Sequence, residues 1–468
     1  MSPKVGLMST EKYDVIVIGA GFSGLAAGIR MAMYDKRVII LEQHSIVGGL
    51  NSYYRRGPYK FNVGLHAMTN FTEKGNRRSP LGKILKQLRI PYDDLKLRPQ
   101  GHSLIHFPQG VLKFENGVDS LVESISEVFP HSKDDFVELV KAVLDYPDMD
   151  LQAPFTSAKS FVRGFIKDES LLEMIFCPLL IYGSACENDM DTQQFVIMFK
   201  SIFCEGFCSP EGGIRPILKM LSELFKSKGG ELKMRASVSK ILTKNEEVSG
   251  VQLDSGDVVN APVVLSSMGH PETLASVQTE RVKPNVSSGP MGFSETIHLF
   301  EEKPKAWGAE ATVVFQCDTE KYHYRSPENF IDTRSAVICY PNNFEPDDEK
   351  EGICRVTRLA NYDVWNNFDD ETYLKHKEKL LLDSRNLIER FKGSALPNLL
   401  FEDGFTPKTI ERYTRHFRGA IYGSPEKLKD GKTDWDGLYL IGTDQGFLGI
   451  VGSMLSGISM ANMYGLKS

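Results

Sequence analysis

The first strong pattern in the sequence is a short apolar run at Asp14–Ile18, followed by glycines and a helical stretch that reaches Tyr34. A second apolar run, RVIILE at 37–42, ends in an acidic residue. Short runs rich in β-branched residues are typical of buried strands. The order strand, glycine loop, helix and strand therefore predicts a βαβ unit.

From about residue 80 to residue 205 the pattern is mainly helical. Apolar residues recur at helical spacing over 118–129 and again over 136–144. The stretches LLEMIFCPLLIYG and FVIMFKSIF are apolar on all sides, which predicts buried helices. Their aromatic and methionine content suits either ordinary core or the wall of an apolar tunnel.

After residue 205 the pattern returns to mixed helices and strands. An amphipathic helix begins near Ile214 and stops at a paired glycine, and the strands that follow include a hairpin at Asp254–Gly256. Residues 292–360 contain alternating strands, which predicts an antiparallel sheet with one covered face. A charged helix follows near 370–392, and its charges predict a solvated face.

The element order predicts an α/β protein in which a second domain is inserted into the first. At 468 residues the chain exceeds the size at which a single core stops growing. We expect a discontinuous Rossmann-like cofactor-binding domain and an inserted α+β substrate domain, made of a helical region and an antiparallel sheet. The predicted boundaries are 11–80, 206–285 and 426–468 for the cofactor domain, and 81–205 and 286–425 for the substrate domain.

The glycine loop of the βαβ unit has the spacing G-x-G-x-x-G that is typical of dinucleotide binding. Gly19 permits a tight turn, Gly21 lets the backbone approach a pyrophosphate, and Gly24 lets the helix pack closely on the strand. Ser23 lies at the helix N-terminus, whose free N–H groups and positive dipole end would face the phosphates. Glu42 is predicted to accept hydrogen bonds from ribose hydroxyl groups.

The last apolar segment, Gly437–Asn462, predicts a strand, a glycine-rich turn and a helix. A second set of backbone donors favours FAD over NAD, because one βαβ unit holds only the AMP half of so long a cofactor. Gly442 would allow close approach and Asp444 would bind a ribityl hydroxyl or a bridging water. A helix beginning near Gly452 would face the flavin or its phosphate. No second complete glycine motif is present to bind NADPH.

The segment LEQHSIVGGLNSYYRRGPYKFNVGLH at 41–66 resembles the stretch after the Rossmann unit in the phytoene desaturase, carotenoid isomerase and retinol saturase family of flavoproteins. It is most similar to the retinol saturase form. Further similar stretches are EGGIRPILKMLSELFKSKGGELKMRASVSKI, FTPKTIERYTRHFRGAIYG and LYLIGTDQGFLGIVG. The resemblance covers both ends of the cofactor domain and its middle strand.

This resemblance implies further cofactor contacts. Gly48 and Gly49 would contact the pyrophosphate or flavin, and the backbone of Val238 would lie against adenine. The ribityl chain and isoalloxazine would lie beside Asp444, Ile450 and Val451. The chain departs from many relatives at Leu50, where they have arginine, so that Asn51 and Ser52 become the nearest polar candidates.

In this family the flavin carries out the chemistry and the protein supplies an apolar slot and orientation. His66 closes the glycine-bearing segment and is our candidate catalytic residue, as a group for proton transfer opposite the hydride. The alternative is a histidine hydrogen-bonded in the domain interface. Tyr413, Arg415 and Tyr422 are expected to line the cleft or join the domains.

Three functions stay open. The first is a flavin enzyme acting on carbon–carbon bonds of an apolar polyene or isoprenoid, by saturation, desaturation or cis–trans isomerisation. The second is a flavin amine or amino-acid oxidase, and the third a non-catalytic flavin-binding or chaperone-like protein. A redox reaction would need a separate electron donor or acceptor, such as a quinone, oxygen or a reductase.

Amino-acid composition and charge limit the classes of partner that we expect the protein to bind. The net charge of -6 and the absence of long Lys/Arg runs argue against nucleic acid. Seven cysteines without a C-x-x-C pair predict neither a disulfide framework nor a metal site, although Cys204 and Cys208 lie one helical turn apart. The N-terminal MSPKVGLMSTEKY has no secretory h-region, and no long apolar span is present. These features predict a cytoplasmic protein; the family resemblance adds peripheral contact with a membrane.

Overall fold

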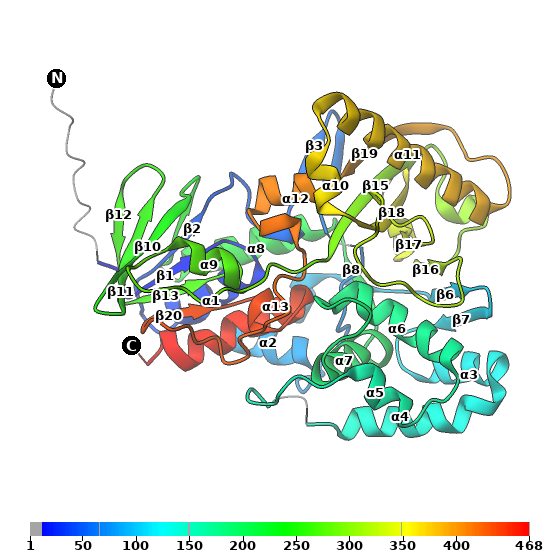
Figure 1. The fold of residues 1–468 in the computed structure, drawn as a ribbon, viewed down its shortest axis with the longest axis horizontal. Helices are drawn as coiled ribbons and strands as arrows, with labels where there is room; N and C mark the ends of the chain where they lie inside the picture. Colours follow the sequence, from blue (N-terminus) through cyan, green and yellow to red (C-terminus); the bar gives the residue numbers. More distant parts are fainter. Residues whose placement is uncertain (1–11, 65, 148–149, 348, 468) are drawn as a thin grey trace.

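A parallel sheet assembled from three distant parts of the chain lies at one end of the molecule (Figure 1). The computed structural model describes residues 12–64, 66–147, 150–347 and 349–467. In order across the sheet, the strands are β20 (Leu438–Leu440), β13 (Val263–Ser266), β1 (Val15–Ile18), β2 (Val38–Glu42) and β9 (Glu231–Met234), and neighbouring strands are parallel. The predicted βαβ unit is confirmed, and the N-terminal, middle and C-terminal pieces meet in one sheet as expected.

Both faces of this sheet are buried, because alternate side chains of each strand point to opposite sides. Val15 and Val17 pack on helices, while Ile16 and Ile18 pack on a second sheet. The helices are α1 (Phe22–Ala32), α2 (Pro80–Leu88), α8 (Ile214–Ser227) and α13 (Gly449–Met460). The opposite layer consists of β10 (Val238–Lys244), β11 (Glu247–Leu253), β12 (Val258–Asn260), α9 (His270–Ser276) and β14 (Val277–Gln278).

The second domain is built on a seven-stranded sheet. Its order is β19 (Leu399–Phe405), β15 (Gly292–Phe300), β18 (Gly352–Ala360), β17 (Ser335–Cys339), β16 (Val313–Cys317), β6 (Ser103–Phe107) and β7 (Gly110–Phe114). All pairings are antiparallel except that of β16 with β6. The expectation of a mainly helical region before residue 205 is therefore incomplete, because the β6–β7 hairpin in that region extends the sheet of the later segment.

The sheet is covered on both faces, whereas the sequence predicted one covered face. On one face Val314 and Ile338 pack against Leu387 of α11 (Asp370–Lys392). On the other face Phe315 and Val337 join the core of a helical layer. That layer contains α3 (Asp119–Val128), α4 (Lys133–Asp145), α5 (Ala158–Arg163), α6 (Glu169–Gly183) and α7 (Thr192–Phe199). In Figure 1 this layer lies below the sheet and α11 lies above it.

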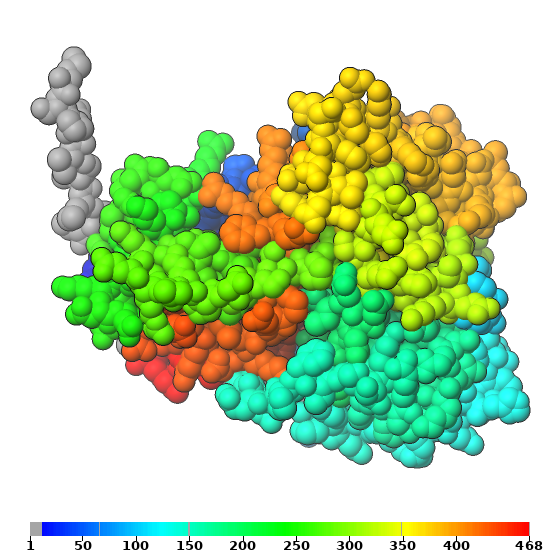
Figure 2. Space-filling model, in the orientation of Figure 1, coloured from blue at the N-terminus to red at the C-terminus, as the bar shows by residue number. Residues whose placement is uncertain are grey.

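Short elements connect the two domains. They are the hairpin β3 (Tyr53–Arg56) and β4 (Tyr59–Asn62), the strand pair β5 (Leu97–Pro99) and β8 (Cys208–Pro210), and the helices α10 (Tyr362–Asn367) and α12 (Pro407–Thr414). In the space-filling view the orange segment that contains α12 lies between the green part of the cofactor domain and the yellow part of the substrate domain (Figure 2). This segment is thus placed to form part of a site between the domains.

Some expectations fall outside the described residues. Residues 11 and 468, at the outer limits of the predicted cofactor domain, and residues 1–11 of the stretch without an h-region lie there. Within the described parts of the chain, no helix combines the length and the apolar content needed to cross a membrane.

Candidate functional site

A single cavity of about 1130 Å³ runs from the glycine loop of β1 to the interior of the substrate domain. This volume exceeds the roughly 300–1,000 Å³ of ordinary small-molecule pockets. Residues from all three pieces of the cofactor domain line it, together with side chains of α6, α7 and the seven-stranded sheet. The cavity therefore has enough volume for a ligand larger than ordinary small molecules, and it is lined by both domains.

The glycine loop forms one wall of this cavity. Gly19 has a φ of +96°, which only glycine adopts readily. A Cβ at Gly21 would meet no atom within 4 Å, so open space lies over the start of α1, which has no side-chain cap. Gly24 lies outside the lining, and a Cβ there would lie 2.0 Å from the carbonyl oxygen of Gly19, in agreement with its predicted role in close packing. Ser23 lines the cavity.

Glu42 lies at the end of β2, where it joins three parts of the site. The backbone N–H of Ala20 donates to its Oε2 (2.7 Å), and that of His44 donates to its Oε1 (2.8 Å). The N–H of Ala236 donates to its carbonyl oxygen (2.8 Å). The side chain is buried but still lines the cavity, and Val238 lines it on the adjoining segment. The carboxylate therefore shapes the glycine loop as well as facing the ligand space.

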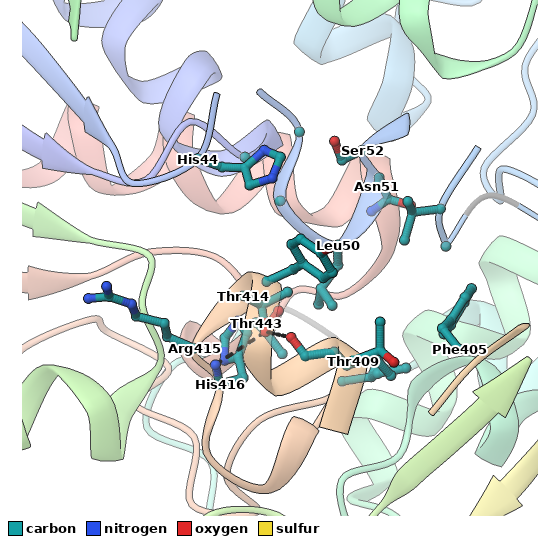
Figure 3. A pocket seen from close by; sticks show the side chains of 18 of the residues that line it. His44, Leu50, Asn51, Ser52, Phe405, Thr409, Thr414, Arg415, His416 and Thr443 are labelled. Atoms are coloured by element: carbon teal, nitrogen blue, oxygen red, sulfur yellow. Dashed lines mark hydrogen bonds between the residues drawn. The ribbon is translucent and has the colours of Figure 1, made fainter. Parts of the chain in front are cut away.

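The segment after β2 passes along the cavity as predicted from the resemblance. Gly48, with φ of +116°, donates its N–H to the carbonyl oxygen of Ala20 (2.9 Å). Gly49 and Asn51 also line the cavity. Figure 3 shows the segment Leu50–Ser52 facing residues that come from α12 and the turn after it. Asn51 and Ser52 thus place polar groups beside Leu50 in the cavity wall, and the Ser52 hydroxyl donates to the carbonyl oxygen of Val47 (3.1 Å).

The C-terminal turn differs from the prediction by one residue. Gly442 and Thr443 line the cavity, but Asp444 does not. The Asp444 carboxylate is buried and accepts hydrogen bonds from the backbone N–H groups of His270 (2.6 Å) and Ser424 (2.9 Å). It also accepts one from Nζ of Lys427 (3.0 Å). Asp444 thus joins elements of the fold, and Thr443 is the polar residue of this turn that faces the ligand space.

The final helix begins earlier than predicted. α13 starts at Gly449, with no side-chain cap, rather than near Gly452. Ile450 lines the cavity beside this N-terminus, whereas Val451 is buried outside the lining. The N-termini of α1 and α13 both border the same cavity. Their free N–H groups and positive dipole ends suit a bound anion.

His66 lies in the cavity wall and is held by the substrate-domain sheet. Its Nε2 is 2.7 Å from Oε2 of Glu295 and 2.7 Å from Oγ1 of Thr357. Glu295 on β15 also forms a buried ion pair with Arg355 on β18, whose Nε lies 2.6 Å from Oε1. Glu295 faces Thr357 in the strand register. His66 therefore lies in the cavity wall and is hydrogen-bonded to the substrate-domain sheet, while its catalytic role stays a prediction.

The carboxylate in this network is permanently charged near neutral pH. Burial of Glu295 opposes its ionisation, but the charges and hydrogen bonds of Arg355 and His66 outweigh this effect and lower its pKa to about 2. A fixed anion 2.7 Å behind the histidine orients its ring. The arrangement can therefore hold or move a proton at the cavity wall.

The far end of the cavity is apolar. Helices α6 and α7 contribute Ile181, Tyr182 and Met198, although most of their apolar residues belong to the core. Phe293 and Tyr422 form an edge-to-face pair with ring centroids 5.7 Å apart. Most apolar residues of these helices therefore belong to the core, as one interpretation expected, and a few line the cavity, as the other expected. This end suits an apolar ligand and supplies few polar partners.

The segment around α12 closes the opposite side. Tyr413 contacts His44 edge to face, with ring centroids 5.7 Å apart. Arg415 donates from Nη1 to Oγ of Ser237 (2.6 Å), and both residues line the cavity (Figure 3). As predicted, these residues line the cleft and join the domains.

The remaining polar candidates lie elsewhere. Cys204 and Cys208 do not line the cavity, and burial raises the pKa of the Cys204 thiol to about 11. Among the described residues, no group of three or more His, Cys, Asp or Glu side chains is placed to hold a metal ion.

Sequence reasoning missed Thr443, Glu295, Arg355 and Thr357. The usable signal was weak: Glu295 and Arg355 are charged residues within two strands, GFSETIHLF and GICRVTRLA, that mix apolar and polar residues. Buried strand positions exclude unpaired charges, so two of opposite sign predict a buried pair or a functional site.

Comparisons with known proteins agree with this geometry. The family description "NAD(P)-binding Rossmann-like domain" matches residues 17–84, so the first unit is of a dinucleotide-binding type. Prolycopene isomerase 2 from an Oncidium hybrid cultivar is 25% identical and covers 97% of this chain and 84% of its own length. The 4,4'-diaponeurosporene oxygenase of Staphylococcus aureus is 23% identical over 89% of each chain.

The solved structures support the same architecture. A crystal structure of an oxidoreductase from Methanosarcina mazei matches with a TM-score of 0.67 at 15% identity, and covers 97% of this chain and 100% of that one. At this identity the match shows the fold. The chain is thus similar in sequence to the prolycopene isomerases and to 4,4'-diaponeurosporene oxygenase over most of its length, in agreement with the predicted resemblance to carotenoid-related flavoproteins.

Proposed function

We propose that this protein is an FAD-dependent oxidoreductase acting on carbon–carbon bonds of an apolar polyene or isoprenoid. The observation that carries the proposal is the continuity of one cavity from the glycine loop to an apolar end in the substrate domain. The relatives named prolycopene isomerase and 4,4'-diaponeurosporene oxygenase support a substrate of this class.

The residues present fit FAD. Gly21 leaves open space over the uncapped start of α1, where the pyrophosphate would accept backbone hydrogen bonds. Glu42 would meet the ribose of the AMP half, and Val238 its adenine. Gly442, Thr443 and the start of α13 would meet the ribityl chain and flavin. The cavity lining continues from the βαβ unit to Gly442 and Thr443 of the C-terminal turn, which favours FAD over a cofactor bound only at the βαβ unit.

When bound, the flavin supplies hydride exchange at N5, and the protein provides binding, orientation and exclusion of water. The apolar end, with Tyr182, Phe293 and Tyr422, would hold the substrate chain. His66 would hold or receive a proton at the cavity wall. Tight apolar walls around few polar groups suit a hydrocarbon better than an amine.

The proposal covers saturation, desaturation and cis–trans isomerisation. The first two need a separate electron donor or acceptor, and the isomerisation is redox-neutral. A substrate of this class dissolves in lipid, so contact with a membrane surface during substrate uptake is part of the proposal.

Anaerobic absorbance spectra of the purified protein test the proposal. We expect a yellow protein whose flavin spectrum changes, or whose bound polyene changes isomer, when retinoids or carotenoids are added. A flavin reduced by amines, with hydrogen peroxide released in air, would identify an amine oxidase instead. A protein that takes up no flavin from an excess of FAD would refute the proposal.

A further inference from the structure

The network behind His66 contains charges that balance one another. Arg355 and Glu295 form a buried ion pair, with each side chain at most 3% exposed. The pair is neutral as a unit, and His66 binds to it through Nε2 only. In the described part of the chain, no hydrogen bond to Nδ1 of His66 is found. The second ring nitrogen is therefore the one left for the cavity.

We propose that Glu295 and Arg355 are positioning residues that fix the His66 ring by its Nε2 and keep Nδ1 as a proton-exchanging group in the cavity wall. This inference rests on the proposed function, because it assigns His66 a task in that reaction. A proton given by Nδ1 to a substrate carbon is restored from water, and a proton taken up is released to water. The histidine therefore ends each turnover as it began.

Three neutral side chains with raised pKa values face this network. Burial raises the pKa of Tyr54 on β3 and of Tyr182 on α6, and it raises that of Cys339 on β17 to about 12. All three stay uncharged over the physiological range. Cys339 also donates from Sγ to the carbonyl oxygen of His66 (3.3 Å), which fixes the backbone next to the ring.

The two partners of the ion pair should act on His66 in opposite directions. Glu295 places an anion 2.7 Å from Nε2, and an anion at such a distance generally favours the charged form of a neighbouring base. Arg355 opposes protonation by offsetting that anion. Removing the carboxylate should therefore lower the midpoint of the His66 titration, and removing the guanidinium should raise it. If the pair only stabilised the fold, removing Glu295 and removing Arg355 would not shift the His66 midpoint in opposite directions.

Histidine NMR on selectively labelled protein tests this inference without any substrate. The His66 signal is assigned by its loss in His66→Gln. We expect Glu295→Gln to lower its titration midpoint by about one unit or more, and Arg355→Gln to raise it. Thr357→Val removes a hydroxyl and no charge, so its shift should be small. Glu173→Gln, which breaks the buried Lys159–Glu173 pair in the helical layer, is the matched control and should cause no shift.

An unchanged His66 titration in Glu295→Gln overturns the inference, and it does so even where Arg355→Gln fails to fold. The pH dependence of polyene turnover supplies a second measurement. In Glu295→Gln, the pH at which turnover is half-maximal should shift in the same direction as the NMR midpoint. Absence of flavin binding or of turnover in the natural protein would refute the proposed function, while the NMR shifts would still decide the role of Glu295.

Discussion

A Cβ at Gly457 would lie 2.0 Å from the carbonyl oxygen of Ser23, so α13 contacts the backbone of α1 directly. The same Cβ would lie 3.1 Å from the backbone nitrogen of Ala27. No side chain fits between the two helices at this point. Their contact brings the N-termini of both helices to one cavity.

Gly457→Ala should separate these helices. The added methyl group would meet backbone that cannot move aside, and overpacking of this kind costs roughly 1–3 kcal/mol. We expect a lower midpoint of urea unfolding and weaker uptake of FAD. Gly101→Ala is the control, since a Cβ at Gly101 meets no atom within 4 Å. Equal stability of the two variants would contradict the proposed packing.

The substitution Gly21→Ser should weaken FAD binding without reducing the stability of the fold. Serine is a preferred N-cap residue, so the free energy of unfolding should stay unchanged or rise slightly. Its hydroxyl would enter the open space and satisfy the N–H groups that the pyrophosphate needs. We expect FAD affinity, measured by quenching of flavin fluorescence, to fall about tenfold or more, which is about 1.4 kcal/mol. Unchanged affinity would exclude the cofactor from this loop.

Glu42→Gln should weaken both the loop and the cofactor site. An amide keeps only one acceptor oxygen for the N–H groups of Ala20 and His44, and hydrogen bonds to a charged group contribute about 1.5–3 kcal/mol. We expect a loss of FAD affinity in that range by calorimetric titration. Glu223→Gln, at an exposed position on α8, should bind FAD like the natural protein.

Adjacent residues of the C-terminal turn should give opposite phenotypes. Thr443→Val should reduce FAD affinity by about 0.5–1.5 kcal/mol with little change in stability. Asp444→Asn should destabilise the fold by roughly 1–3 kcal/mol, because the partly buried Lys427 amine loses its anionic partner and the N–H groups of His270 and Ser424 lose a charged acceptor. Denaturation curves and FAD titrations of both variants make the comparison. A stable Asp444→Asn protein with poor FAD binding would restore Asp444 as a direct ligand.

The pH dependence of stability should contain a contribution from Glu272. Burial raises its pKa to about 7, so the folded state holds its proton at pH values where the unfolded chain has lost it. This contribution is present below about pH 4.5 and is lost as pH rises toward 7. We expect Glu272→Gln to gain stability relative to the natural protein between pH 5 and pH 8. Urea unfolding at both values measures the difference, with exposed Glu280→Gln as control.

The cofactor domain was largely predictable because its determinants are local. Strand, glycine loop, helix and terminal acid follow one another within about thirty residues, and each step has a steric reason, as at Gly19 and Gly24. The βαβ unit and the helix over 370–392 were found at nearly their observed limits. The joining of three pieces was also correct, since only a C-terminal strand and helix could complete the cofactor site.

The substrate sheet was harder because its pairings join distant residues. Strand β6 pairs with β16 more than two hundred residues later, and Ser103–Phe107 alone resembles many short loop-flanked strands. The cover on the second face of the sheet was hard to predict for the same reason, because it also depends on contacts between distant residues. This cover is α11, whose sequence is dominated by charge and whose buried residues include Leu387 and Ile388.

The turn at Gly442 shows the limit for single residues. Thr443 and Asp444 both lie in one tight turn, and sequence alone does not decide which of two neighbours faces a cavity. The partners of His66 were also out of reach, because Glu295 and Arg355 meet it only after the strands have paired.

The order of the chain has a consequence for assembly. Helix α13 follows every other α-helix along the described chain. Its N-terminus nevertheless borders the same cavity as the N-terminus of α1. During synthesis the substrate lobe and most of the parallel sheet emerge while that side is still open. Loading of the nucleotide would then be a late event, and a nascent protein stalled before Gly449 would be unable to retain it.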